Sequence, residues 1–254
     1  MILYFSATGN TEFVAKKLAE YMNDEVINLL ERIRNKDYSE IHSDRPFVIC
    51  SPIYVCEMPR FFADFIDKLE LTGNRNVYYV FTSGGYAGIA AALGRKQAKR
   101  KGMVYRGRAE FRMPRNYPIS RRYPLLPENE VLERIEDTKK KLPEVAKQIY
   151  NGERIKLRRL TYFEKIVTYP FNPVWVKYKH TAKPFHTTEK CMGCGKCARV
   201  CPLNNIKLVD KKPQWGNTCA HCMACMSGCP TESIEYGNIT QDKYKYHFKK
   251  FCKD

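Results

Sequence analysis

The chain has 254 residues, which is enough for one domain of ordinary size and a second small one. Its formal net charge is +17, and no apolar run approaches the length of a membrane span or of a signal peptide, which argues against a membrane-embedded or exported protein. We therefore expect a cytoplasmic protein whose eleven cysteines serve as metal ligands rather than as disulfides.

The first segment predicts a strand, a loop and a helix. Residues 1–5 form a continuous apolar run, and apolar residues recur at helical spacing from Phe13 to Tyr21. Such a loop places N–H groups and hydroxyls at a helix N-terminus, where the helix dipole favours an anion. The Walker A pattern is absent, and a Ser/Thr-capped helix without a ligand is the alternative. The candidate anion-binding residues of this first loop are Ser6, Thr8, Gly9, Asn10 and Thr11.

Four more strands are expected to alternate with helices. The strands are predicted at 26–29, 47–50, 77–82 and 104–113, and the helices at 59–69, up to about 101, and at 127–150 with a kink or break at Pro143. This alternation predicts an α/β fold with a doubly wound parallel sheet of five strands, whose ligands bind beyond the carboxyl ends of the strands. Two further loops lie at that edge: Pro52, Ile53 and Tyr54 in the second, and Ser83, Gly84, Gly85 and Tyr86 in the third.

These three loops resemble the FMN-binding loops of the flavodoxin family, over about residues 1–150. The resemblance implies that the first loop holds the FMN phosphate and that the other two approach the isoalloxazine, with Tyr54 and Tyr86 as candidate stacking rings. Flavodoxins are acidic around the flavin and this chain is basic nearby, so the family's very low flavin potential is not carried over. Cys50 and Cys56 flank the second loop. The apolar surroundings favour buried thiols, and a redox role for either one is the alternative.

Residues 151–182 form an aromatic and basic connecting segment. It is too long and too apolar for a mobile linker, so we expect a strap packed over the first domain, with an exposed surface for a membrane or a partner as the alternative. Residues 241–254 form a basic, aromatic C-terminal tail, in which Cys252 has no partner at a ligand spacing. The aromatic residues of the connecting segment are Tyr162, Phe163, Tyr169, Phe171, Trp175 and Tyr178.

Eight cysteines form two copies of the motif C-x-x-C-x-x-C-x-x-x-C-P. Three thiolates at this spacing wrap one face of a [4Fe-4S] cube, and the fourth comes from the other copy of the motif. Zinc ribbons pair two C-x-x-C knuckles and need neither a third cysteine nor a proline, and a disulfide module would carry a signal peptide. We assign Cys191, Cys194, Cys197 and Cys229 to one cluster, and Cys219, Cys222, Cys225 and Cys201 to the other.

At these residues the chain resembles the two-[4Fe-4S] ferredoxin family, a small α+β domain, over about residues 183–240. The whole chain is similar to the flavodoxin-ferredoxin fusion proteins of anaerobic bacteria and archaea. That resemblance implies FMN, two [4Fe-4S] clusters and an electron-transfer flavoprotein that joins one-electron carriers to two-electron chemistry. The alternative is an FMN-dependent reductase of a quinone or a similar small molecule, fed by the clusters.

The positive charge indicates an acidic partner, such as a ferredoxin, a flavodoxin or a redox enzyme. We expect a basic cluster in the middle of the chain to project near the flavin edge and to receive this partner. No recognised DNA- or RNA-binding motif is present, which argues against nucleic acid, whereas contact with a membrane surface is left open. The basic cluster consists of Arg95, Lys96, Lys99, Arg100, Lys101, Arg106, Arg108, Arg112, Arg115, Arg121 and Arg122.

Overall fold

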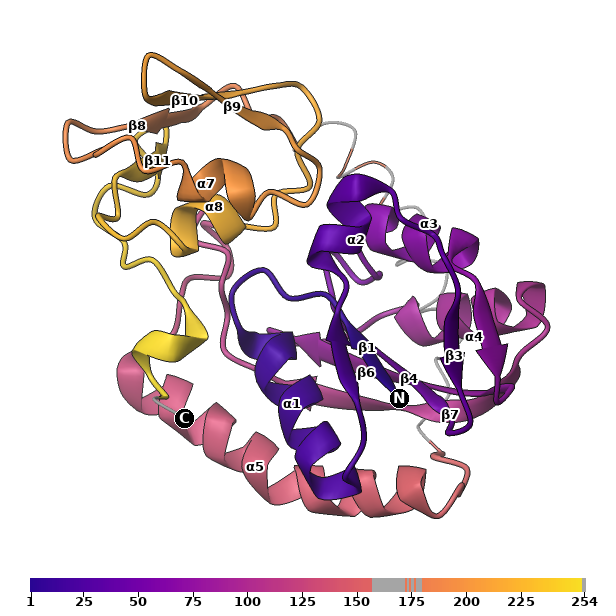
Figure 1. The fold of residues 1–254 in the computed structure, drawn as a ribbon. Helices are drawn as coiled ribbons and strands as arrows, with labels where there is room; N and C mark the ends of the chain where they lie inside the picture. The colour runs from indigo at the N-terminus through magenta and orange to yellow at the C-terminus, as the bar shows by residue number, and fades with distance from the viewer. Residues whose placement is uncertain (157–171, 173, 175, 177–179, 253–254) are drawn as a thin grey trace.

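The computed structural model describes residues 1–156, 172, 174, 176 and 180–252. The aromatic residues that we expected to form a strap lie outside these described residues. Within them, every helix is too short or too polar to cross a bilayer. Figure 1 shows an α/β unit built from the first part of the chain and a smaller unit, rich in loops, built from residues after 180.

The predicted five-stranded parallel sheet is confirmed. Its order is β2-β1-β4-β6-β7 and all neighbouring strands are parallel. This order, with the first two strands exchanged, is the doubly wound arrangement of flavodoxin-like folds. Both faces of the central strand β4 are buried, which explains its unbroken apolar sequence. The strands are β1 (Ile2–Tyr4), β2 (Val26–Asn28), β4 (Phe47–Pro52), β6 (Asn76–Ser83) and β7 (Val104–Arg112).

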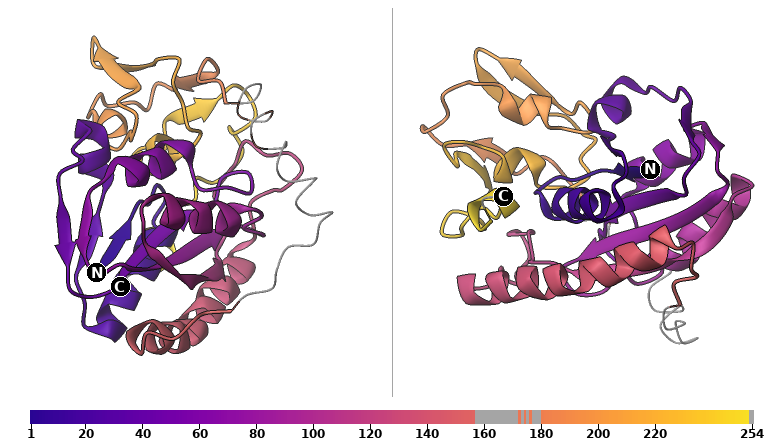
Figure 2. Two further views of the ribbon diagram at one scale, coloured as in Figure 1. Left: turned by 90° about the vertical axis from the view of Figure 1, so that its right-hand side faces the viewer. Right: turned by 60° about the horizontal axis from the view of Figure 1, so that its bottom comes forward.

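Helices cover both faces of the sheet (Figure 2). Because alternate residues of a strand face opposite sides, Tyr4 packs with α1 and α5 in one core, and Leu3 packs with α2, α3 and α4 in the other. The helices are α1 (Asn10–Met22), α2 (Leu30–Asn35), α3 (Arg60–Lys68), α4 (Ala90–Arg100) and α5 (Glu128–Tyr150).

The expected break at Pro143 is wrong, since α5 runs as one helix of 23 residues. Pro143 lies on the exposed side of the helix, where a carbonyl that loses its N–H partner can bond to water. The sequence also gave no sign of β3 (Ile41–Ser43) and β5 (Leu71–Gly73), which pair in parallel beside the main sheet. Their sequences, Ile-His-Ser and Leu-Thr-Gly, lack the continuous apolar run that predicted β1.

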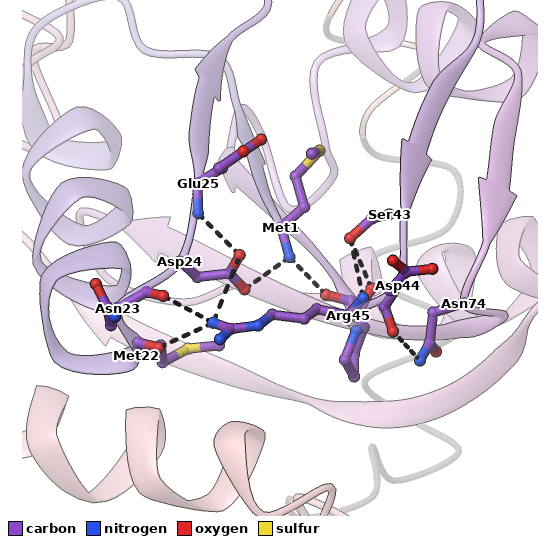
Figure 3. A network of polar contacts seen from close by, with 10 residues as sticks. Met1, Met22, Asn23, Asp24, Glu25, Ser43, Asp44, Arg45 and Asn74 are labelled. Carbon is purple, nitrogen blue, oxygen red and sulfur yellow. Dashed lines mark hydrogen bonds and ion pairs between the residues drawn. The ribbon is translucent and has the colours of Figure 1, made fainter.

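Polar contacts fix the edge of the sheet at which the strands begin (Figure 3). The Met1 amine lies 2.8 Å from Asp24 Oδ2 and donates to the Pro46 carbonyl at 3.0 Å. Arg45 donates to the carbonyl of Asn23 at 2.7 Å and reaches the same Asp24 carboxylate at 3.9 Å. These contacts hold one end of the sheet and leave the opposite edge, where the strands end, for other contacts.

The C-terminal unit has two antiparallel strand pairs and a core of its own. Its elements appear in a repeated order of strand, short helix and strand, as two copies of a motif would give. They are β8 (Phe185–Thr187), α7 (Lys196–Arg199), β9 (Ile206–Val209), β10 (Lys212–Trp215), α8 (Ala224–Ser227) and β11 (Ile234–Tyr236).

The C-terminal tail joins the two units. Residues Tyr246 and Phe248 are buried in the same core as α1, and the Phe248 ring stacks on Phe13 with 4.5 Å between ring centroids. Figure 1 shows this part of the chain descending from the C-terminal unit toward α1 and α5. At its start, the Lys245 ammonium lies 2.8 Å from Glu235 on β11, and both side chains are buried. The tail therefore packs against both units.

Replacing Lys245 with methionine should lower the free energy of unfolding by about 3–5 kcal/mol, because it leaves the Glu235 carboxylate buried and unpaired. Chemical denaturation measures this loss. The matched control is Lys16→Met, which removes an exposed ion pair with Glu12 and should cost about 0.5 kcal/mol or less. Equal losses in the two variants would show that the buried pair does not stabilise the protein more than a surface pair.

Candidate cofactor sites

Three loops converge on one cavity at the carboxyl edge of the main sheet, because all five strands point the same way. They are the predicted first, second and third loops, which follow β1, β4 and β6. A fourth segment after β7, which the sequence did not indicate, completes the wall. The cavity is lined by Ser6, Ala7, Thr8, Asn10, Thr11, Pro52, Ile53, Tyr54, Thr82, Ser83, Gly84, Pro114 and Asn116.

Three of the predicted residues do not line this cavity. The residues that line the cavity do not include Gly9, Gly85 or Tyr86. The Tyr86 side chain is 41% exposed, as expected for a residue in a loop at the surface.

The first loop is held by its neighbours rather than by capping its own helix. Helix α1 begins after Gly9 and has no side-chain cap hydrogen bond. Thr11 Oγ1 lies 2.8 Å from Thr82 Oγ1, and the Asn116 amide donates to Thr8 Oγ1 at 2.6 Å. Ser6 Oγ accepts from the Gly9 N–H at 3.2 Å, but the N-cap residue Gly9 itself has no side chain to cap the helix. The first N–H groups of α1 remain without a side-chain cap beside the cavity, as an anion site requires.

Gly9 has a backbone role. Its φ of 95° lies in the left-handed region, and a Cβ atom there would be 2.5 Å from the Cβ of Phe248. The tail closes over this point, since the Phe248 N–H donates to the Thr8 carbonyl at 2.8 Å and the Tyr246 hydroxyl donates to Asn10 Oδ1 at 2.6 Å. The tail thus packs against the outer side of the first loop.

The second loop is strained and brings Tyr54 to the C-terminal unit. Val55 and Cys56 both have left-handed backbone angles, with φ of 50° and 68°. Such angles are costly for any residue other than glycine, and most of all for the β-branched Val55. The Asn172 amide donates to the carbonyls of Tyr54 and Val55, at 3.0 Å each. Burial raises the pKa of the Tyr54 phenol well above its usual value, and the nearby Cys222 thiol raises it further. The buried Tyr54 hydroxyl has no hydrogen-bond partner among the described residues.

The eight motif cysteines line two separate cavities. Each cavity takes three cysteines from one copy of the motif and one from the other, as the predicted crossing of Cys201 and Cys229 requires. Among the described residues, no three His, Cys, Asp or Glu side chains are placed to hold a single metal ion. The first cavity is lined by Cys191, Cys194, Cys197 and Cys229, and the second by Cys219, Cys222, Cys225 and Cys201.

The two cysteine cavities differ in their surroundings. In the first, Cys194 is exposed, and Cys229 Sγ lies 3.3 Å from Ser233 Oγ. Burial raises the pKa of Cys229, but hydrogen bonds from Ser233 and Thr231 outweigh it and hold this pKa below its usual value. In the second, burial raises the pKa of Cys225 to about 12. Buried thiols that are costly to ionise are expected at a metal site, because the bound metal centre supplies the positive charge that compensates the thiolates.

The fourth segment connects the loop cavity to the second cysteine cavity. Asn116 donates to Thr8, as described above, and the adjacent Tyr117 hydroxyl lies 2.9 Å from Nδ1 of His221. His221 stands between two motif cysteines, and its other ring nitrogen lies 2.8 Å from the Thr181 carbonyl. Sequence reasoning missed Asn116, Tyr117 and His221 because they belong to no motif and come together only in space.

The three remaining cysteines line neither cysteine cavity. Cys50 is fully buried on β4, and burial raises its pKa far above the usual value. Cys56 lies in the strained turn of the second loop, where burial also raises its pKa. Cys252 packs against the core shared by α1 and α5.

The basic cluster does not form a single face near the loop cavity, which corrects our expectation. Helix α4 runs back along the sheet, so its last turn lies at the edge where strands begin. There Arg100 pairs with Asp67 at 2.7 Å and Lys101 donates to the Leu69 carbonyl at 2.6 Å. Arg115 does lie near the cavity, since a Cβ atom at Gly84 would be 3.1 Å from its Cγ. Residues close in sequence are thus spread over both edges of the sheet.

Parts of the chain are similar to known families and structures. Models of the 4Fe-4S binding domain match residues 184–207 and 216–237. Solved structures similar to the chain include the Trp repressor binding protein from Bacillus subtilis, with 14% identity over 63% of this chain and 100% of that one and a TM-score of 0.37. The two-electron reduced flavodoxin of Megasphaera elsdenii is 16% identical over 58% of this chain and 99% of that one, with a TM-score of 0.33.

An azoreductase from Bacillus anthracis is 11% identical over 58% of this chain and 98% of that one, with a TM-score of 0.36. No curated protein matches the chain. The chain therefore joins a flavodoxin-like sheet, recognised by its strand order, to two 4Fe-4S binding motifs of ferredoxin type. This is the combination that the resemblance to flavodoxin-ferredoxin fusions implied.

Replacing Gly9 with alanine should lower the free energy of unfolding by about 1–3 kcal/mol, because the new methyl group meets Phe248 and the left-handed backbone disfavours any side chain. The matched control is Gly85→Ala, where a Cβ atom meets nothing within 4 Å and a change within about 0.5 kcal/mol is expected. Chemical denaturation again provides the measurement. An equal effect of both changes would argue against the packing of the tail on the first loop.

Proposed function

We propose that this protein is an electron-transfer iron-sulfur flavoprotein, which passes electrons between an external low-potential carrier, two [4Fe-4S] clusters and FMN, and on to a protein or small-molecule acceptor. When bound, the clusters carry single electrons and the flavin carries one or two. One observation carries the proposal: a single segment after β7 links the two cavities. Asn116 donates to Thr8 at the sheet-edge cavity, and the Tyr117 hydroxyl lies 2.9 Å from Nδ1 of His221, which lines the second cysteine cavity.

The cysteine ligand sets fit two cubanes. Each cavity is lined by four motif cysteines, one of which crosses from the other copy of the motif. We propose that Cys191, Cys194, Cys197 and Cys229 hold one cluster, and that Cys219, Cys222, Cys225 and Cys201 hold the other.

The sheet-edge cavity fits FMN. Hydroxyl and amide groups of the first loop surround the uncapped start of α1, which suits a terminal phosphate. The chain lacks the G-x-G-x-x-G pattern of a pyrophosphate site, which favours FMN over FAD. In this proposal the first loop orients the phosphate, and Tyr54, whose buried hydroxyl has no partner among the described residues, packs beside the ring system.

The domain organisation follows from these sites. We propose a flavin domain over residues 1–150, a connecting segment over 151–182, a ferredoxin domain over 183–240 and a tail over 241–254. The tail is then part of the interface between the domains, because it packs against both of them. Eight of the eleven cysteines serve as cluster ligands in this proposal, which favours a reducing compartment such as the cytoplasm.

The double change Thr8→Ala and Thr11→Ala should weaken FMN binding about tenfold or more, because each hydroxyl bonded to a charged phosphate contributes about 1.5–3 kcal/mol. Fluorescence titration of the flavin-free protein with FMN measures the change. Iron content should be unaffected. Thr72→Ala, on β5 of the separate β3–β5 pair, is the control. Extracted flavin identified as FAD, or unchanged affinity in the double variant, would contradict the assigned site.

Reduced acidic ferredoxin should reduce the flavin of the loaded protein, seen as loss of its visible absorbance under anaerobic conditions. Cys222→Ala should lower the iron content from about eight to about four per chain and abolish this reduction, because Cys222 lies in the cavity nearest to the flavin loops. Cys252→Ala should change neither property. Flavin reduction at the normal rate in the Cys222 variant would contradict the proposed route. Rapid turnover of a quinone without a protein acceptor would favour the FMN-dependent reductase.

A further inference from the structure

We propose that the external carrier is an acidic one-electron protein that docks on a small face of the C-terminal unit around Cys194. The inference rests on the proposed function and adds where the partner binds. The proposed face takes the place of the basic cluster in the middle of the chain as the expected docking surface, because the residues of that cluster lie at two edges of the sheet. We call this surface the cluster-edge face, and it consists of Met192, Cys194, Arg199, Leu208, Lys211 and Lys212.

Exposure singles out this face. Cys194 is the one exposed cysteine among the eight motif cysteines. A carrier protein must approach the edge of a cluster, and a cluster held by Cys194 would come nearest to solvent here. The second cysteine cavity, in contrast, lies toward Tyr54 and Tyr117 of the flavin unit. The chain therefore offers an outer cavity for exchange with a partner and an inner cavity for exchange with the flavin.

The centre of the cluster-edge face is apolar. Met192 is 64% exposed beside the first motif cysteine, and Leu208 is 43% exposed on the β9–β10 hairpin. Leu208 belongs to the same surface, because a Cβ atom at Gly195 would be 3.0 Å from its Cδ1. Exposed methionine and leucine side chains around a redox centre provide the small apolar contact that a transient complex needs.

Cations surround this apolar centre and touch the loop of the first cysteines. Arg199 donates to the Cys194 carbonyl at 3.1 Å, and Lys212 donates to the Cys191 carbonyl at 3.4 Å. Lys211 packs against the same loop, since a Cβ atom at Gly193 would be 2.8 Å from its own Cβ.

Two exposed carboxylates, Glu189 and Asp210, lie nearby in sequence and offset part of this charge. Three cations remain in contact with the loop. A partner with an acidic rim and a small apolar centre is complementary to such a surface.

The test uses oxidised acidic two-cluster ferredoxin as the probe, so that binding is measured without electron transfer. Calorimetry at an ionic strength of about 0.02 M compares the loaded wild type with the double variant Lys211→Glu and Lys212→Glu. The dissociation constant should rise about tenfold or more, because two attractive charges become repulsive. The matched control is Arg95→Glu with Lys96→Glu on α4, which changes the net charge equally and should shift affinity less than about twofold.

Iron content of each variant shows whether the cluster is retained. If the double variant loses iron, Lys211→Glu alone repeats the test, because its ammonium makes no hydrogen bond among the described residues. Met192→Ser provides a second test without a charge change and should weaken binding about threefold or more through loss of apolar contact.

Three outcomes would overturn the proposal. The first is that the wild type does not bind the ferredoxin. The others are that the double variant on the β9–β10 hairpin (the hairpin variant) and the double variant on α4 lose affinity equally, or that the α4 variant loses more. Binding of the wild type to phosphatidylglycerol vesicles that is lost in the hairpin variant, with ferredoxin binding unchanged, would assign the face to a membrane and also overturn it. Failure of the proposed function is distinguishable, because the ferredoxin would then bind with the expected pattern while the flavin stayed oxidised.

Discussion

The common direction of the five strands is the constraint on which the rest of the molecule depends. Because β1, β4, β6 and β7 all end at one edge, the loops that follow them meet there and form one cavity. The C-terminal unit is packed beside it. Tyr117, in the segment after β7, reaches His221 in the wall of the second cysteine cavity because β7 ends at that edge.

The interface between the units is held by specific polar contacts as well as by apolar packing. Arg34 on α2 donates to Oδ1 of Asn204 at 2.9 Å, while the Asn204 amide donates back to the Arg34 carbonyl at 2.9 Å. On the other side, the buried Lys245 and Glu235 pair fixes the start of the tail. A buried ion pair adds little net stability, but breaking it is costly, so it favours one arrangement of the tail over others.

Much of this organisation is visible in the sequence. Apolar runs separated by helical periodicity predicted the five strands of the sheet, and the cysteine spacing predicted which cysteines share a cavity in the structure, although their role as cluster ligands stays a prediction. The features that the sequence did not indicate arise from residues that are far apart in the chain and meet only in the folded protein. Asn116 and Tyr117 carry no motif, and β3 lacks a continuous apolar run. The basic cluster was misplaced because charges adjacent along α4 and β7 are carried to opposite edges.

The contact between the tail and the first loop affects how the protein is made. Asn10 and Tyr246 are hydrogen-bonded across 236 positions of the chain, so this loop acquires that neighbour only after the long intervening stretch has been synthesised. Contacts between such distant residues form slowly, because the entropy of closing the intervening chain is lost before they contribute. The first strands can fold early on the ribosome, whereas the loop nearest to the start of the chain is among the last parts to reach its final packing.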